Sequence, residues 1–93
     1  MNRLTRALDS NNSYVVDDAN IQHDVNGYFG DAVNKLAKFE NIYDDLISQQ
    51  SKISKELEKL RLESKTHSVK FRQLLTNKLT NNNILMLFET YGL

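Results

Sequence analysis

The sequence predicts a mainly α-helical protein whose long helix forms a coiled-coil or helical-bundle oligomer. Three observations support this fold class. The chain contains no Pro, and no Gly lies between Asp31 and Tyr91, so nothing in this stretch breaks a helix. Apolar residues recur there with alternating spacings of four and three, which is the 3.5-residue repeat of supercoiled helices. The 93 residues are 40% hydrophobic and lack Cys, so one small domain with a marginal core and no disulfides is expected.

The first 30 residues differ from the rest and contain two of the three Gly. Two short β-prone pieces, residues 2–7 and 13–17, flank a polar cluster at 9–12 that suits a turn. An isolated β-hairpin is only marginally stable in water, so this one would have to pack on another part of the chain. Two interpretations of residues 1–30 therefore remain, a small β-hairpin and a frayed N-terminal arm.

A long helix is predicted over residues 31–79. Gly30 interrupts regular structure, and Asp31 is a competent N-cap. The apolar stripe then runs without a slip over six heptads: Ala32, Leu36, Phe39, Tyr43, Leu46, Gln50, Ile53, Leu57, Leu60, Ser64, His67, Phe71 and Leu74. Such a helix would be about 70 Å long at 1.5 Å per residue. It cannot bury its own stripe, so it must pair with another copy or fold back on itself.

Pairing between copies is the preferred interpretation. The predicted oligomer interface comprises Leu36, Phe39, Tyr43, Leu46, Gln50, Ile53, Leu57, Leu60, Phe71 and Leu74. Gln50 is a polar stripe residue that could fix the register of the pair. The stripe is weakest at residues 63–68, where a kink or an intrachain hairpin is the competing geometry.

Charge favours antiparallel helices. Residues 1–51 hold four basic and eight acidic residues, a net of −4, whereas residues 52–93 hold eight basic and four acidic residues, a net of +4. Parallel pairing of two copies would set like charges side by side, and antiparallel pairing would set opposite charges together. By the same reasoning an intrachain hairpin is disfavoured, because it would return the basic tail to the basic middle of the chain.

A short C-terminal helix is predicted over residues 80–93. The polar run at 80–83 separates it from the long helix, and a cluster of apolar residues follows: Ile84, Leu85, Leu87, Phe88 and Tyr91. A helix this short does not stand alone in water. The segment is therefore a candidate to cover apolar surface of this protein or to dock on a partner.

The sequence carries no recognisable catalytic or cofactor-binding pattern. His23 and His67 are far apart, and Asp44 and Asp45 are adjacent, so they do not share a helix face. No Gly-rich phosphate loop, metal-ligand spacing or nucleophile motif is present. We therefore expect no enzyme activity, no cofactor and no metal. No apolar run is long enough to span a membrane, and the absence of Cys fits a reducing cytoplasm.

One basic stretch is a candidate for phosphate contacts. It contains Lys65, Lys70, Arg72 and Lys78 and no acidic residue. A basic helix face can bind nucleic acid. Because the acidic half of the same chain already complements these cations, self-association explains them without nucleic acid, and nucleic-acid binding is the third hypothesis for function.

Several motifs near the N-terminus resemble short proteins of phages and prophages of Gram-positive bacteria. The chain opens Met1-Asn2-Arg3-Leu4-Thr5, continues through Tyr14-Val15 and Gly27, and enters a helix at Ala32 that reads Lys35-Leu36-Ala37-Lys38-Phe39-Glu40. Members of that group begin M-x-R-L-T and enter a helix that reads A-x-x-K-L-A-x-Y/F-E. The resemblance covers about the first 40 residues, and Phe39 stands where Tyr is commoner. It implies a phage or prophage origin and a host cytoplasm, and it transfers no functional residue.

The first hypothesis for function is a phage- or prophage-encoded helical oligomer that acts as a non-catalytic module for protein–protein interaction or assembly. The second is a small inhibitor or modulator of a host defence or replication protein. The third is the nucleic-acid accessory protein. The partners expected are therefore other copies of this chain and a host or phage protein.

Overall fold

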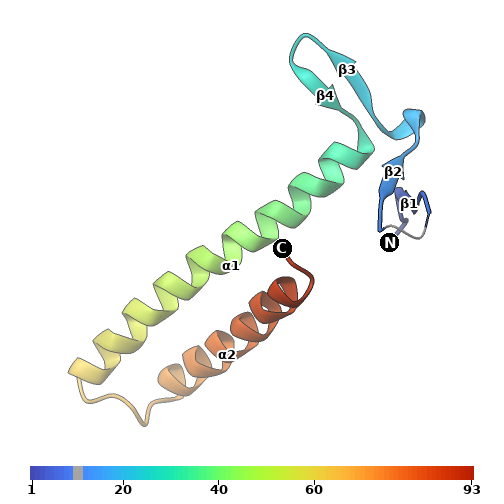
Figure 1. Ribbon diagram of the computed structural model, residues 1–93. Coiled ribbons are helices and arrows are strands. Elements are labelled where there is room, and N and C mark those ends of the chain that lie inside the picture. The colour runs from blue at the N-terminus through green and yellow to red at the C-terminus, as the bar shows by residue number, and fades with distance from the viewer. Residues whose placement is uncertain (10–11) are drawn as a thin grey trace. The chain divides into compact units, whose positions relative to one another are not determined.

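The structure is a computed structural model that describes residues 1–9 and 12–93, so the predicted turn at 9–12 lies partly outside the described residues. Two helices dominate it, α1 at Asp31–Leu62 and α2 at Val69–Thr90 (Figure 1). The prediction of a mainly helical protein with a long helix and a shorter C-terminal one is confirmed. The chain divides into two compact units, Met1–Asn41 and Ile42–Leu93, which we call the N-terminal unit and the helical hairpin.

The N-terminal unit contains two antiparallel β-hairpins. The first pairs β1 (Thr5–Ala7) with β2 (Tyr14–Val16), which selects the small β-hairpin from the two interpretations that the sequence left open. A 3-10 turn, η1 (Asp18–Asn20), follows. The second pairs β3 (Gln22–Asp24) with β4 (Gly27–Phe29) and was not predicted.

Local side chains and glycines shape this second β-hairpin and its exit. Asp24 Oδ1 accepts a hydrogen bond of 2.8 Å from the Asn26 backbone N–H, which closes the turn. Gly30 has a φ of +123°, and a Cβ at this position would lie 2.8 Å from the carbonyl oxygen of Asn20. A side chain at Gly30 would therefore disrupt the entry into α1.

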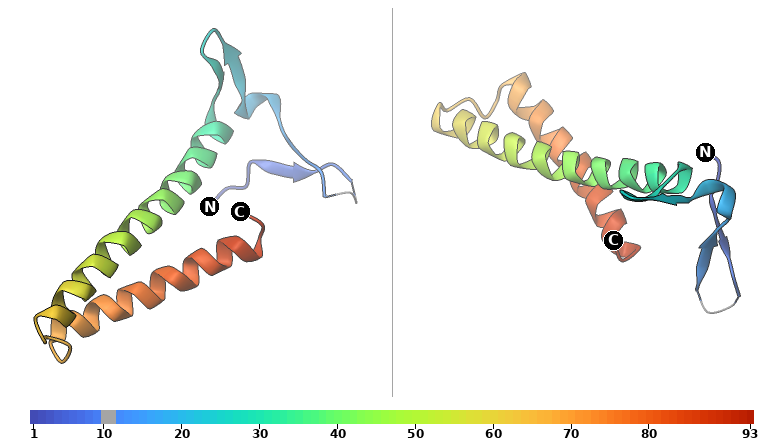
Figure 2. Two further views of the ribbon diagram at one scale, coloured as in Figure 1. Left: turned by 60° about the vertical axis from the view of Figure 1, so that its left-hand side comes forward. Right: turned by 90° about the horizontal axis from the view of Figure 1, so that it is seen from above.

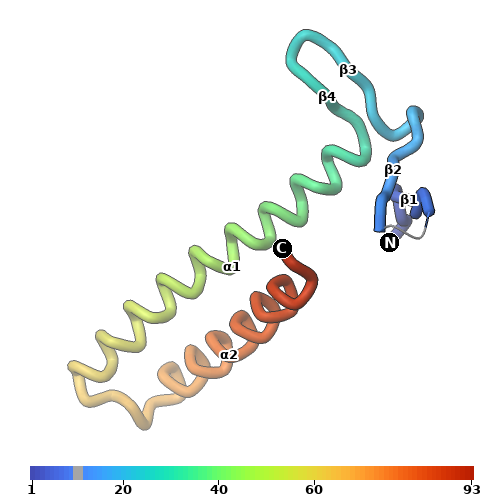
Figure 3. The backbone as a smooth tube through the Cα atoms, in the orientation of Figure 1, coloured from blue at the N-terminus to red at the C-terminus, as the bar shows by residue number. Residues whose placement is uncertain are grey.

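The first helix ends at Leu62 rather than at residue 79, which corrects the prediction of one continuous helix. Beyond it the chain reverses in a turn at residues 63–68 (Figure 3). The Ser64 N–H donates to Arg61 O and the Lys65 N–H donates to Leu60 O, the paired hydrogen bonds of a Schellman motif. Ser64 has a φ of 57° and occupies the left-handed position that usually holds Gly.

The second helix begins at a well-formed cap and is longer than predicted. Ser68 Oγ accepts from the Phe71 N–H at 3.1 Å and donates to Lys65 O at 2.8 Å. From there α2 continues through residues 80–83, where a break between helices was predicted. Asn81 is only 9% exposed, and its side chain contacts α1. Tertiary contacts therefore override the low helix propensity of this polar run.

The helices α1 and α2 run antiparallel and pack against each other within one chain (Figure 2). Leu57, Leu60 and Phe71 form the buried core, with Ile53, Leu74 and Leu75 packed against it. The stripe that was expected to pair between copies is thus covered by the protein's own α2. The charge argument against this intrachain hairpin was wrong because Glu56, inside the basic middle of the chain, pairs with Lys70 of α2 at 2.7 Å.

Leu57 should be essential to the helical hairpin. Its side chain is 1% exposed, so Leu57→Ala should lower the free energy of unfolding by about 3 kcal/mol through lost burial and a residual cavity. Leu62→Ala is the matched control, because Leu62 lies on the same helix but is 79% exposed. We expect the control to change stability by less than about 0.5 kcal/mol. Urea denaturation followed by circular dichroism measures both, and equal effects would contradict this core.

Candidate interaction surface

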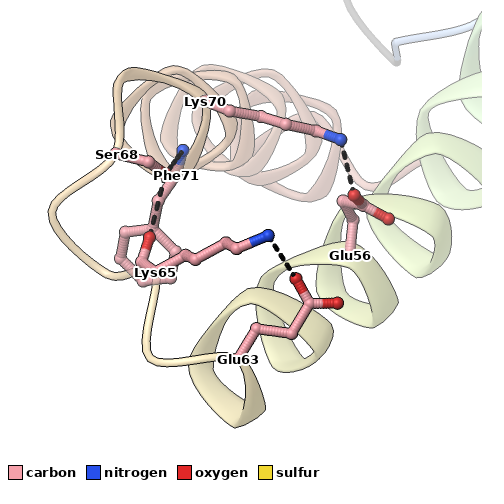
Figure 4. A network of polar contacts seen from close by, with 6 residues as sticks. All are labelled: Glu56, Glu63, Lys65, Ser68, Lys70 and Phe71. Atoms are coloured by element: carbon pink, nitrogen blue, oxygen red, sulfur yellow. Dashed lines mark hydrogen bonds and ion pairs between the residues drawn. The ribbon is translucent and has the colours of Figure 1, made fainter.

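The end of the helical hairpin nearest the turn is held by charged and polar contacts (Figure 4). Lys70 Nζ lies 2.7 Å from Glu56 Oε1 and joins the two helices, and Lys65 Nζ lies 3.0 Å from Glu63 Oε2. The ammonium of Lys70 lowers the pKa of Glu56 below its ordinary value of 4.5, by a hydrogen bond and by its charge. Both helices are thereby fixed to each other close to the point where the chain reverses.

Further from the turn, side-chain amides connect the two helices. Gln50 Nε2 donates to Asn82 Oδ1 at 2.7 Å and to the Lys78 carbonyl oxygen at 3.1 Å. Asn81 Nδ2 donates to Gln49 Oε1 at 3.3 Å. Gln50 Oε1 is buried without a hydrogen-bond partner. A buried amide that pairs at only one position along an apolar stripe favours one register, and here that register is between α1 and α2 of one chain.

Two rows of residues form one flank of the helical hairpin. On α1 the row steps by seven through Ile42, Gln49 and Glu56, and in α2 and its C-cap it steps by seven through Lys70, Asn77, Ile84 and Tyr91. The ion pair Glu56–Lys70 joins the two rows at the end nearest the turn. Along this flank the chemistry changes from ionic near the turn, through amides, to apolar at the far end.

The apolar end of this flank is a solvent-exposed surface that we call the apolar edge; it consists of Ile42, Ile84, Leu87 and Tyr91. Their exposed fractions are 47%, 38%, 57% and 77%. Residues 84, 87 and 91 have the three-and-four spacing of one helix face. Exposed apolar residues that are contiguous are characteristic of interaction surfaces, whereas single ones are ordinary. The apolar edge is therefore the candidate functional surface of the helical hairpin.

The structure divides the predicted C-terminal segment between two roles. Leu85 and Phe88 are half-buried and face α1, and the Phe88 ring lies 6.1 Å from the Tyr43 ring in an edge-to-face contact. Ile84, Leu87 and Tyr91 remain exposed. Both alternatives raised by the sequence, covering this protein's own surface and presenting a docking face, thus have residues to support them.

The residues of the predicted oligomer interface also separate. Seven residues of that set are covered where α1 and α2 pack against each other within one chain: Leu46, Gln50, Ile53, Leu57, Leu60, Phe71 and Leu74. Tyr43 is 40% exposed despite its contact with Phe88. Leu36 and Phe39 lie in the N-terminal unit and line a cavity there. The packing expected between copies is therefore replaced, for most of the set, by packing inside the helical hairpin.

The cavity in the N-terminal unit is apolar and has a volume of about 390 Å³. Its wall is formed by β1, β2 and the first turns of α1 together with Ile21: Leu4, Thr5, Val16, Ile21, Ala32, Val33, Lys35, Leu36 and Phe39. Lys35 Nζ donates a hydrogen bond to the Asn2 carbonyl oxygen at its rim. Because few polar groups line it, the cavity suits an apolar side chain and offers little to orient a polar substrate.

The candidate phosphate-binding residues do not form one basic face. Lys65 is paired with Glu63, and Lys70 is paired with Glu56. Lys70 and Arg72 are two positions apart and so face different sides of α2. Lys78 is half-buried, and its carbonyl accepts from Gln50. His67 lies exposed in the turn. The basic stretch is therefore dispersed, and half of its cations already have carboxylate partners.

Comparisons with known proteins add no identity: no family model, no curated protein and no solved structure matches the chain. In residues 1–9 and 12–93, no helix is both long enough and apolar enough to cross a membrane. Within the same part of the chain, no group of three or more His, Cys, Asp or Glu side chains is placed to hold a metal ion. The apolar edge is thus assigned by its geometry alone.

The Glu56–Lys70 pair should make stability depend on pH. Because the folded-state pKa of Glu56 lies below 4.5, its carboxylate stabilises the fold above that pH, and the contribution disappears as pH falls through the lowered pKa. Glu56→Gln should therefore be less stable than wild type at pH 7 and equally stable in strong acid. Urea denaturation at a series of pH values measures the difference. Glu58→Gln is the control, because Glu58 pairs with Arg61 of its own helix at 3.6 Å; a difference of the same size would contradict the assignment.

Proposed function

We propose that the protein is a non-catalytic helical module for protein–protein interaction that self-associates through the apolar edge. The observation that carries this proposal is the exposure of Ile42, Ile84, Leu87 and Tyr91, all at the end of the helical hairpin away from the turn. The expected partner is a second copy of the chain, because the same surface on two copies forms the self-complementary contact of a two-fold dimer.

The size of the core supports self-association. Among the described residues, Leu46, Leu57, Leu60 and Phe71 are the buried apolar side chains. Two packed helices give a narrow core, and a small domain with so little burial is commonly stabilised by oligomerisation. Four-helix packing of two hairpins would bury the apolar edge and widen that core.

Charge supports an antiparallel arrangement of the two α2 helices, centred near Leu87. The cations Lys70, Arg72 and Lys78 lie in the half of α2 nearest the turn, and Glu89 is the only acidic residue of this helix. Parallel packing would bring the basic halves of two copies together. Antiparallel packing keeps the basic halves apart and joins the other halves, in which Glu89 is the charged residue.

The resemblance of the first 40 residues supports a phage or prophage origin, and with it action in the host cytoplasm. Self-association of a phage protein favours a role in assembly. The second candidate is a modulator of a host defence or replication protein, and it is favoured by the same edge, which would then receive a host helix. Nucleic-acid binding is not favoured, because Lys65 and Lys70 are engaged in ion pairs.

The proposal predicts that Leu87→Lys converts the oligomer to a monomer. The side chain is 57% exposed, so the substitution should leave the fold intact, while a lysine ammonium at the centre of the interface cannot be desolvated without a partner. Light scattering measures the molar mass, and circular dichroism at the same concentration verifies the helix content.

Leu79→Lys is the matched control for this experiment. Leu79 lies on α2 with a similar exposure of 64% but outside the apolar edge. The control should retain the mass of the wild type. A wild-type protein that is monomeric at high concentration would refute self-association, and equal loss of mass in both variants would refute the assignment to the apolar edge.

A further inference from the structure

We infer that the turn at residues 63–68 is a hinge through which two copies exchange their α2 helices. In the exchanged dimer α1 and α2 of each chain become one continuous helix, and two such helices pair antiparallel. Every contact now made between α1 and α2 within a chain is then made between chains. This exchange is independent of the apolar edge, which lies at the other end of the helical hairpin.

The first observation is that the apolar stripe keeps its phase across the turn. Leu57 and Phe71 are two heptads apart, and so are Leu60 and Leu74, with Ser64 and His67 at the intervening stripe positions. A hairpin does not require this phase, because the turn resets the direction of the second helix. A continuous helix does require it, since only then does one stripe face one partner.

The second observation is the conformation of the turn itself. Residues 63–68 contain neither Gly nor Pro, so no residue in the turn forbids a helix. Ser64 is held at a φ of 57°, a conformation that costs free energy for a residue with a Cβ. Straightening the turn releases this strain, and strained hinge loops favour exchange of an element between identical chains.

The third observation is that the contacts are arranged symmetrically along the chain. The pairs Gln49–Asn81, Glu56–Lys70 and Tyr43–Phe88 all have their midpoints between residues 63 and 66. A two-fold axis near residues 64–65 therefore brings the partners of each pair to within about three residues of each other between two antiparallel continuous helices. The amide pairs would select the same register in the exchanged dimer as in the monomer.

Two features oppose exchange and define how to control it. Opening the turn removes the hydrogen bonds made by Ser68 Oγ to the Phe71 N–H and to Lys65 O. It also brings Lys65 of one copy close to Lys65 of the other at the two-fold axis, a repulsion that salt screens. Substitutions at positions 64 and 68 should therefore shift the equilibrium between the hairpin and the exchanged dimer, some toward the hairpin and others toward the dimer.

The experiment compares two hinge variants in the Leu87→Lys background, where edge-mediated association is removed. Ser64→Ala with Ser68→Ala favours a continuous helix, because Ala has the highest helix propensity and cannot cap. Ser64→Gly favours the hairpin, because Gly adopts a positive φ without strain. We expect the dimer dissociation constant of the Gly variant to be at least about a hundredfold higher, since each dimer contains two hinges that each shift by about tenfold.

Cross-linking then identifies which chains touch. The chain has no Cys, so Glu56→Cys with Lys70→Cys introduces one specific pair, treated with a short thiol-specific cross-linker and resolved on a denaturing gel. The dimer fraction of the Ala variant should give covalent dimers, and the Gly variant should give cross-linked monomers. Two results would overturn the hinge. One is a dimer fraction of the Ala variant that yields cross-linked monomers and no covalent dimers, and the other is an Ala variant that forms no dimer at any salt concentration. In the Leu87→Lys background the Gly variant does not exchange its helices, so any dimer that it forms must come from the apolar edge. Such a dimer would count against the proposed function and not against the hinge.

Discussion

The structure depends on how a single apolar stripe on α1 is covered. Leu46, Ile53, Leu57 and Leu60 lie on one face of a helix of 32 residues, and that face gains stability only when another helix excludes water from it. The second helix supplies this cover with Phe71, Leu74 and Leu75. Because the two helices are consecutive and the chain reverses at residues 63–68, the cover comes from the same chain. The six residues of the turn therefore shape the fold of the helical hairpin.

The pairing between the helices is specified by polar residues rather than by the apolar ones. Leucines along a stripe tolerate a shift by one heptad, because one apolar contact replaces another. The amides do not, since a shift would leave Gln50 and Asn81 buried without their partners. The ion pair Glu56–Lys70 adds a second constraint near the turn. Burial thus provides the stability of the helical hairpin, and hydrogen bonding determines its alignment.

The sequence allowed the helical class, the stripe and the first β-hairpin to be predicted, because each is encoded in local periodicity or turn chemistry. It did not allow the end of α1 to be predicted. The turn contains no Gly or Pro, and Ser64 adopts a φ of 57° that its residue type does not favour. The break predicted at residues 80–83 failed because Asn81 contacts Gln49 of α1, which is distant in sequence. The apolar edge could be found only from the structure, because the exposure of Ile42 and Ile84 depends on how α2 covers α1. Three-residue strands such as Gln22–Asp24 are too short for an alternating pattern to be recognised.

The change of chemistry along one flank, from the ion pair at Glu56 and Lys70 to the apolar end at Ile84 and Tyr91, makes the two ends respond to different physical conditions. Added salt weakens exposed ion pairs and leaves apolar contacts intact or strengthens them. Cooling weakens the apolar contacts instead, because the hydrophobic contribution fades as temperature falls. The end near the turn, which combines the Glu56–Lys70 pair with the buried core of Leu57, Leu60 and Phe71, is therefore sensitive to both salt and cold, whereas the apolar end is sensitive to cold alone.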